Sequence, residues 1–270
     1  MLKERVRTAV LMLLVLVPAM LWLPQTGWAL FTAAILAVGA WEWGGLAAYG
    51  EAQRKAYAAA LLALMLALLY AFPALAHWPD VSLRPMVFSL YAVATLFWLV
   101  LVPLWLARRW PCRGWIGAAL GVMVLLPAWL AAVQFRALGV PVLLAVLSIA
   151  WVADIAAYFA GRAFGRHKLA PAISPGKTWE GAAGAVAGVL VLGLWLGPRA
   201  NLGYVAWALM LIVLTAVSIV GDLFESLLKR QAGIKDSSAL LPGHGGVLDR
   251  IDSLTAILPV CACCSLFLLP

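Results

Sequence analysis

Charged side chains are scarce in this sequence. Asp, Glu, Lys and Arg make up 11% of the 270 residues, whereas a soluble domain carries about a quarter. Hydrophobic residues make up 66%, so lipid rather than water is expected to be the solvent for most of the chain. The net charge of +8 comes without a basic segment interleaved with aromatic residues, so we expect no nucleic-acid partner.

Several other patterns are also missing. The apolar runs are continuous and do not alternate with period two, which argues against a transmembrane β-barrel. The sequence has no Walker-type G-x4-G-K-[ST] motif and no internal repeat. Cys261, Cys263 and Cys264 lie in an apolar run without a histidine nearby, and Cys112 stands alone, so neither a metal set nor a disulfide is indicated. A helical membrane protein remains.

Nine apolar segments are long enough to cross a bilayer as helices. They cover residues 8–24, 28–48, 56–76, 86–107, 115–133, 140–160, 179–198, 203–224 and 251–269. The predicted fold is therefore an all-α, polytopic helical bundle. We divide it into residues 1–139, about five helices for scaffold and lipid access, and residues 140–270, which carry the two longest polar loops, 161–178 and 225–250.

The distribution of basic residues predicts the orientation. With the N-terminus inside, all but three of the 19 Lys and Arg residues fall in inside loops, the exceptions being Arg84, Arg136 and Arg199. The positive-inside rule then predicts N-in and C-out, in the cytoplasmic (inner) membrane with both long loops facing the cytosol. Residues 1–29 also allow an interpretation as a signal peptide; we favour an uncleaved first helix.

Three acidic residues lie within apolar segments and beyond their first turn. A carboxylate at that depth costs a few kcal/mol unless it is paired, hydrated or metal-bound. Asp154 and Asp222 are therefore functional candidates, with contact to interfacial water as the alternative, which is weaker for Asp222. Glu42, in the sequence WEWGG, has no partner that the sequence reveals, and pairing and hydration both stay open.

The sequence GDLFESLLKR begins the second long loop. Asp222, Glu225 and Lys229 are spaced three and four residues apart and share one helix face. A simple Glu225–Lys229 pair at a helix end is the alternative. Oxygen ligands grouped with basic side chains suit a magnesium–phosphate site, because Mg²⁺ binds one or two carboxylates together with water and phosphates.

The same loop ends in PGHGGVLDRID, residues 242–252. Its glycines free the backbone to approach a ligand and to point N–H groups at an anion. Asp249 and Asp252 then fall on the first turn of the last helix, where carboxylates are stabilised by the helix N-terminus. For Asp252, a capping role is the alternative to a functional one.

These stretches are similar to a known family. From Ser226 to Asp252 the sequence reads S-x-L-K-R-x4-K-D-x-S-x2-L-P-x-H-G-G-V-x-D-R-I-D. It resembles, position for position, the signature of the phosphatidate cytidylyltransferases, or CDP-diacylglycerol synthases. The stretch from Ser174 to Gly181 looks like the family's second block, S-P-x-K-T-x-E-G. Length and multi-span layout agree, although the first 140 residues carry no motif of their own.

The resemblance implies an activity. The enzyme would transfer the cytidylyl group of CTP to phosphatidate in phospholipid biosynthesis, giving CDP-diacylglycerol and pyrophosphate. It implies Mg²⁺ as cofactor, with a second cation in the same site left open. The implied partners are CTP, phosphatidate and the surrounding membrane lipid, and a second copy of the chain in a homodimer.

The resemblance and the local chemistry together give each site residue an expected role. Asp222 and Asp249 are the leading metal ligands, and Asp154 is a third. The residues expected to face phosphates of CTP or of the lipid are Lys229, Arg230, Lys235 and Arg250, with His244 as a donor to a phosphate oxygen. The remaining substrate contacts are expected from Ser174, Lys177, Thr178, Glu180, Gly245 and Gly246.

Simpler explanations exist for several of these residues. The basic ones serve equally as positive-inside anchors, and a lone loop histidine often makes a structural hydrogen bond. Ser174 or Thr178 followed by Glu180 also fits helix capping.

Two other functional classes fit a polytopic chain with buried acids. A transporter would place its polar residues near the midplane of a repeat interface, whereas here they gather in two loops on one side. A membrane kinase acting on a lipid alcohol would also use a nucleotide and Mg²⁺, but it would release a nucleoside diphosphate instead of pyrophosphate.

Overall fold

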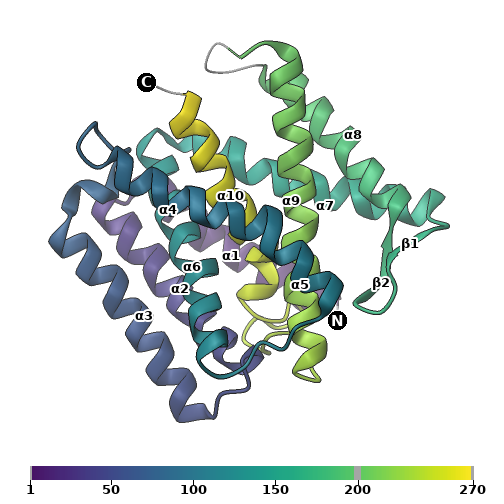
Figure 1. The fold of residues 1–270 in the computed structure, drawn as a ribbon, viewed down its shortest axis with the longest axis horizontal. Coiled ribbons are helices and arrows are strands. Elements are labelled where there is room, and N and C mark those ends of the chain that lie inside the picture. Colours follow the sequence, from purple (N-terminus) through teal and green to yellow (C-terminus); the bar gives the residue numbers. More distant parts are fainter. Residues whose placement is uncertain (1, 198–201, 269–270) are drawn as a thin grey trace.

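The fold is a helical bundle with one small β-hairpin, seen in a computed structural model that describes residues 2–197 and 202–268 (Figure 1). The α-helices are α1 (Leu2–Trp22), α2 (Gln25–Leu46), α3 (Glu51–Ala71), α4 (Arg84–Leu96), α5 (Val102–Arg108), α6 (Gly114–Ala137), α7 (Val140–Phe164), α8 (Trp179–Leu196), α9 (Tyr204–Gln231) and α10 (Leu248–Leu268). A 3₁₀ turn, η1 (Pro73–Ala76), follows α3, and a π-helical segment, η2 (Phe97–Leu101), joins α4 to α5.

The number of membrane-crossing segments agrees with the sequence. Within the described residues, nine helical segments are long and apolar enough to cross a membrane, and α4, η2 and α5 form one of them, Arg84–Arg108. The prediction of an all-α polytopic bundle with nine spans is therefore confirmed. The predicted span ends at residues 198 and 269 lie outside the described residues.

The connections that carry most of the basic residues lie at one end of the bundle. Tyr49 Oη donates to Gly114 O (2.6 Å), and Gln231 Nε2 donates to Trp110 O (2.9 Å). These bonds hold the α2–α3, α5–α6 and α9–α10 connections together. Figure 1 shows the N-terminus and the hairpin toward the right of the bundle and the C-terminus at its upper left.

The opposite end holds the other connections. Arg84 Nη2 donates to Leu266 O (2.6 Å), and Arg136 Nε donates to Met20 O (2.7 Å). Both residues therefore lie at the end to which the loop count assigned them, while Arg199 lies outside the described residues. The connections rich in basic residues therefore lie at one end of the bundle and those with few basic residues at the other, as alternating spans require.

Two predicted loop boundaries were wrong. Helix α9 continues to Gln231 instead of ending near residue 224, and α7 continues to Phe164. The charges that end the apolar run of α9 occupy only one helix face, while Leu227 and Leu228 on the other face stay buried and keep the helix packed. The non-helical part of the second loop is accordingly residues 232–247.

The first predicted loop also contains regular structure. Strands β1 (Lys168–Ala170) and β2 (Ser174–Thr178) pair antiparallel, and α8 follows β2 without a break. Trp179 N donates to His167 O (2.9 Å), which closes the hairpin at the start of α8.

Small residues allow α7 and α8 to pack closely. A Cβ on Gly188 would lie 2.6 Å from Ala156 Cβ, and one on Gly184 would collide with Ala160 Cβ. Gly181, Gly184 and Gly188 thus form the face on which α8 approaches α7 closely. Because β2 leads directly into α8, this contact also fixes the hairpin relative to α7.

Candidate active site

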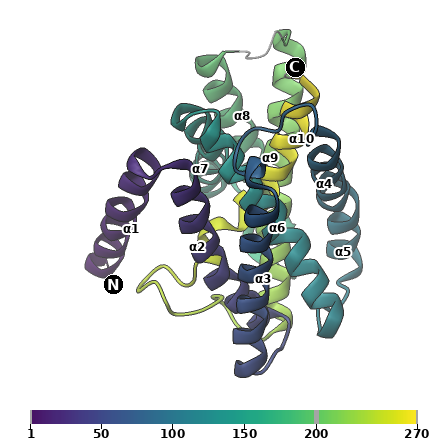
Figure 2. The same cartoon turned by 90° about the vertical axis from the view of Figure 1, so that its left-hand side faces the viewer.

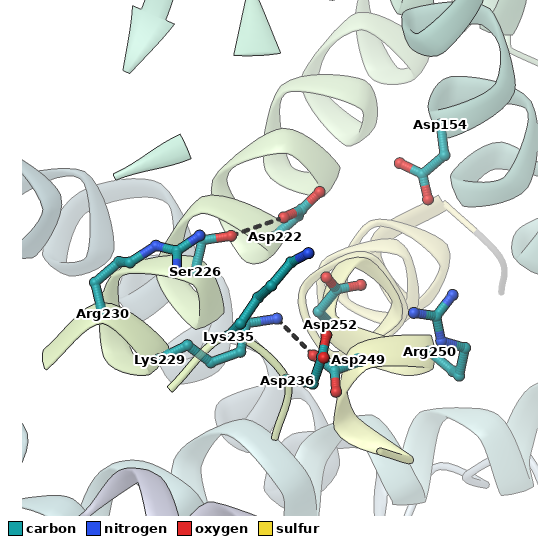
Figure 3. Close-up of a pocket in the computed structure, with 10 residues that line it drawn as sticks. All are labelled: Asp154, Asp222, Ser226, Lys229, Arg230, Lys235, Asp236, Asp249, Arg250 and Asp252. Carbon is teal, nitrogen blue, oxygen red and sulfur yellow. Dashed lines mark hydrogen bonds and ion pairs between the residues drawn. The ribbon is translucent and has the colours of Figure 1, made fainter. Parts of the chain in front are cut away.

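A polar cavity of about 350 Å³ lies where α7, α9 and α10 meet residues 232–247 (Figure 3). Five aspartates, four basic residues and one serine line it. They are Asp154, Asp222, Ser226, Lys229, Arg230, Lys235, Asp236, Asp249, Arg250 and Asp252. Asp222 and Asp249, from α9 and α10, thus line one cavity together with Asp154 of α7.

Close packing of α9 on α10 determines how near the acids come to each other. A Cβ on Gly221 would lie 3.0 Å from Ala256 Cβ and 3.0 Å from Asp252 O. A larger residue would force the two helices apart, so the glycine immediately before Asp222 sets the width of the cavity. Figure 3 shows the carboxylates of Asp154, Asp222 and Asp252 around one space, with the amine of Lys235 beside it.

Asp222 connects α9 to the β-hairpin. Its Oδ2 lies 2.6 Å from Lys177 Nζ, and its Oδ1 accepts a hydrogen bond from Ser226 Oγ (3.3 Å). A second connection is made by Arg230 Nε, which donates to Ile173 O (3.4 Å). The two sequence blocks that resemble one family, distant in the chain, thus meet at one carboxylate.

Asp249 organises the loop that precedes α10. Its Oδ1 lies 2.6 Å from Lys229 Nζ. Its Oδ2 accepts three hydrogen bonds of 2.8 Å, from Ser237 N, Ser237 Oγ and Gly246 N. Both oxygens are therefore engaged by the protein, and the role of Asp249 as a metal ligand stays a prediction.

Gly245 and Gly246 allow the loop backbone to lie close to the carboxylate of Asp249. Gly245 has φ of +79°, in the left-handed region, and a Cβ there would lie 2.6 Å from Asp249 Oδ2. The N–H of Gly246 points at Asp249 rather than into open space. His244 lies in an adjoining cavity, and its buried Nδ1 has no hydrogen-bond partner among the described residues.

Glu42 is the residue whose role the sequence left open. It is 0% exposed, and its carboxylate accepts hydrogen bonds from Ser238 Oγ (2.6 Å), Val247 N (2.9 Å), Leu248 N (2.7 Å) and Ser237 Oγ (3.3 Å). It therefore holds residues 237–248, which include the N-terminus of α10, in place. An acid buried in an apolar segment was the signal, but its partners lie about 200 residues away in the chain.

Six predicted substrate contacts lie outside the lining of this cavity: Ser174, Lys177, Thr178, Glu180, Gly245 and Gly246. Thr178 Oγ1 accepts a hydrogen bond from Gly181 N (3.1 Å), which confirms the capping alternative for this residue. Glu180 Oε1 lies 2.7 Å from His167 Nδ1, and Ser174 pairs with Ala170 in the hairpin. Their roles in substrate binding stay predictions.

The donor set fits a magnesium ion, although the protein alone does not form a full metal shell. Among the described residues, no group of three or more His, Cys, Asp or Glu side chains is arranged as metal ligands. Glu225 is buried and its two carboxylate oxygens accept no hydrogen bond there; the nearest cation is Lys229 Nζ at 3.5 Å. Mg²⁺ requires only one or two carboxylates when substrate phosphates complete its shell.

Comparison with known proteins gives a consistent family. Residues 3–268 match the model of the family described as "Cytidylyltransferase family". The chain is 46% identical to a phosphatidate cytidylyltransferase of Pseudomonas aeruginosa over 269 residues, 97% of this chain and 96% of that protein. Proteins of the same name from Haemophilus influenzae and Staphylococcus epidermidis are 49% and 43% identical over 130 and 129 residues, which is 45% and 47% of this chain and 44% and 50% of theirs.

Proposed function

This chain belongs to the cytidylyltransferase family, and from that premise we propose that it transfers the cytidylyl group of CTP to phosphatidate. The products are CDP-diacylglycerol and pyrophosphate. The relative that matches almost the whole chain bears the name of that activity. The observation that carries the proposal is that the two motif blocks, through Lys177 and Ser226, both contact Asp222, a carboxylate that lines the cavity.

The chemistry requires positioning more than proton transfer. A phosphate oxygen of phosphatidate attacks the α-phosphorus of CTP, and the bond from that phosphorus to the pyrophosphate oxygen breaks. The nucleophile is already an anion, so no strong general base is needed. The protein must hold two polyanions together and stabilise the charge that develops on the leaving group.

The cavity supplies cations for that task. Lys235 and Arg250 form no ion pair with any described residue, so their charge is available to phosphates. Lys229 Nζ lies 2.6 Å from Asp249 Oδ1. This ion pair holds the ammonium group in place before a substrate binds. Arg230 anchors the hairpin through Ile173 and lines the same cavity.

We propose that the acids of the cavity hold Mg²⁺. Asp222 and Asp154, with Asp252 beside them, would supply carboxylate oxygens, and Asp249 would do so only after releasing Lys229. Bound there, a divalent cation would neutralise charge on the phosphates. In support, the lining contains five acids against four basic residues, and the buried Glu225 adds a sixth acid next to it.

We also propose that the chain is an inner-membrane protein with its N-terminus and this cavity on the cytosolic side. The positive-inside rule supports this orientation, because the basic loops gather at the cavity's end of the bundle. CTP is a cytosolic substrate, which agrees with the same assignment. A homodimer stays a prediction from the family resemblance.

Product analysis tests the activity. Purified protein in detergent is incubated with CTP, phosphatidate and Mg²⁺, and pyrophosphate and nucleoside diphosphate are measured separately. We expect pyrophosphate in amounts equal to a lipid-soluble cytidine nucleotide, and none after Mg²⁺ is removed with a chelator. Release of CDP would indicate a kinase, and turnover of neither would contradict the proposal.

A further inference from the structure

A second cavity, of about 560 Å³, adjoins the first and differs from it in charge. The two cavities share Lys235, Asp236 and Arg250. The second adds Arg5 and His244 to these, and Asp236 is the only acid among the described residues that line it. Whereas the first cavity is rich in carboxylates, the second therefore presents mainly cationic groups and suits an anion.

Helix α1 forms one wall of this second cavity. Thr8 Oγ1 donates to Pro242 O (2.8 Å), which ties α1 to the loop. A Cβ on Gly243 would lie 2.9 Å from Arg5 Cγ, so the glycine lets the loop backbone lie directly on the stem of Arg5. The guanidinium group of Arg5 makes no hydrogen bond or ion pair with any described residue, and it lines the cavity.

The same helix is largely exposed along its apolar length. Only 11% of its spanning window is buried, and Val6, Val10, Leu13 and Leu14 are exposed. Figure 2 shows α1 at the edge of the bundle, beside the loop that precedes α10. A cavity walled by a lipid-facing helix is therefore next to the bilayer, where a phospholipid would approach it.

We propose that this second cavity binds the phosphomonoester headgroup of phosphatidate and that Arg5 is one of its phosphate ligands. The inference rests on the proposed function. A phosphomonoester carries a charge of about −1.5 to −2 at pH 7, and a guanidinium group matches its oxygens in a bidentate geometry. Lys235 and Arg250, shared by both cavities, would keep the lipid phosphate next to the nucleotide.

CTP and pyrophosphate also carry phosphate groups, so the test must separate the three ligands. Arg5→Gln is compared with Arg7→Gln, which removes the same charge from the same exposed helix end but from a residue that does not line the cavity. The KM values for phosphatidate in mixed micelles and for CTP, and the inhibition constant of pyrophosphate, are measured for each variant.

We expect the KM for phosphatidate to rise roughly tenfold or more in Arg5→Gln, as for loss of one hydrogen bond to a charged group. The KM for CTP and the pyrophosphate inhibition should stay unchanged, Arg5→Lys should recover part of the loss, and Arg7→Gln should behave like the wild type. An equal rise in the KM for CTP, or equal effects in both Gln variants, would overturn the assignment.

A binding measurement separates this inference from the activity itself. Retention of labelled phosphatidate by the purified protein is measured without CTP, with diacylglycerol as a competitor that lacks the phosphate. Wild-type protein should retain the lipid against diacylglycerol, and Arg5→Gln should retain much less. Should the wild type bind phosphatidate but form no CDP-diacylglycerol, the proposed function fails while the cavity assignment stands. Equal retention by both proteins would refute the cavity assignment alone.

Discussion

Asp222 contacts several parts of the candidate site. It lines the cavity, lies 2.6 Å from Lys177 of the hairpin and follows the glycine that lets α9 approach α10. Its carboxylate has two possible partners, the ammonium group of Lys177 and the proposed Mg²⁺. A substitution that leaves the fold intact measures what this carboxylate contributes to turnover.

Asp222→Asn should reduce turnover roughly a hundredfold or more, since losing about 2.7 kcal/mol of transition-state stabilisation corresponds to that factor. The fold should survive, because the Lys177 ammonium that loses its partner is 24% exposed and can be solvated, so no fully buried charge is left unpaired. Turnover is measured at saturating CTP across a magnesium titration. The matched control is Asp80→Asn at the opposite end, where Asp80 Oδ1 accepts from Ser82 N (3.0 Å) and an amide oxygen can do the same. Near-normal turnover of Asp222→Asn would exclude an essential role.

Glu42 should position the loop without touching substrate. Glu42→Gln replaces one acceptor oxygen with a donor that cannot accept from Val247 N or Leu248 N. Each lost hydrogen bond to a charged group is worth about 1.5–3 kcal/mol, so amide exchange across residues 237–248 should accelerate strongly and turnover should fall with it. Glu51→Gln, which removes a surface carboxylate that pairs with Arg54 and Lys55 and accepts a hydrogen bond from Trp41 Nε1, should change neither. Unchanged exchange in Glu42→Gln would contradict the positioning role.

At the scale of elements, the contact between α7 and α8 carries the hairpin, and Gly184→Ala tests it. The new Cβ would collide with Ala160 Cβ and lie 3.1 Å from Ala156 O, and overpacking of this kind costs about 1–3 kcal/mol. We expect a clearly lower midpoint of thermal unfolding in detergent. Gly203→Ala, where a Cβ meets nothing within 4 Å, should shift the midpoint much less. Equal midpoints would show that the two helices do not pack as closely as described.

The elements also show what the sequence predicts and what it cannot. Continuous apolar runs locate every span, because bilayer thickness imposes their length. They do not locate the end of α9, where apolar and charged residues occupy different faces of one helix. The hairpin of residues 168–178 was missed, since its strands are too short to produce a periodic pattern.

Part of the membership of the candidate site was predictable, but its arrangement was not. The motif spacing identified Asp222, Lys229 and Asp249 as residues of one site. It gave no indication that Lys229 and Asp249 bind each other, or that Glu42 supports the loop. Such contacts join residues far apart in the chain, and a single sequence contains no record of which distant residues meet.

At the scale of the whole molecule, cysteine labelling tests the proposed orientation in the membrane. Arg166→Cys and Leu240→Cys place thiols at exposed positions near the proposed site, and Val81→Cys places one at the other end. The native Cys112 should stay silent, because burial raises the pKa of its thiol to about 12 and only the thiolate reacts. We expect an impermeant maleimide to label only Val81→Cys in intact cells. Labelling of Arg166→Cys or Leu240→Cys from outside would reverse the orientation.

The most direct test of the whole account follows the two ends of the CTP triphosphate. Purified protein is incubated with phosphatidate, Mg²⁺ and CTP labelled either at the α-phosphate or at the γ-phosphate, and the lipid and aqueous phases are counted. The account predicts that the α-label enters the lipid phase as CDP-diacylglycerol while the γ-label stays in water as pyrophosphate. Appearance of the γ-label in lipid would contradict cytidylyl transfer and identify phosphoryl transfer instead.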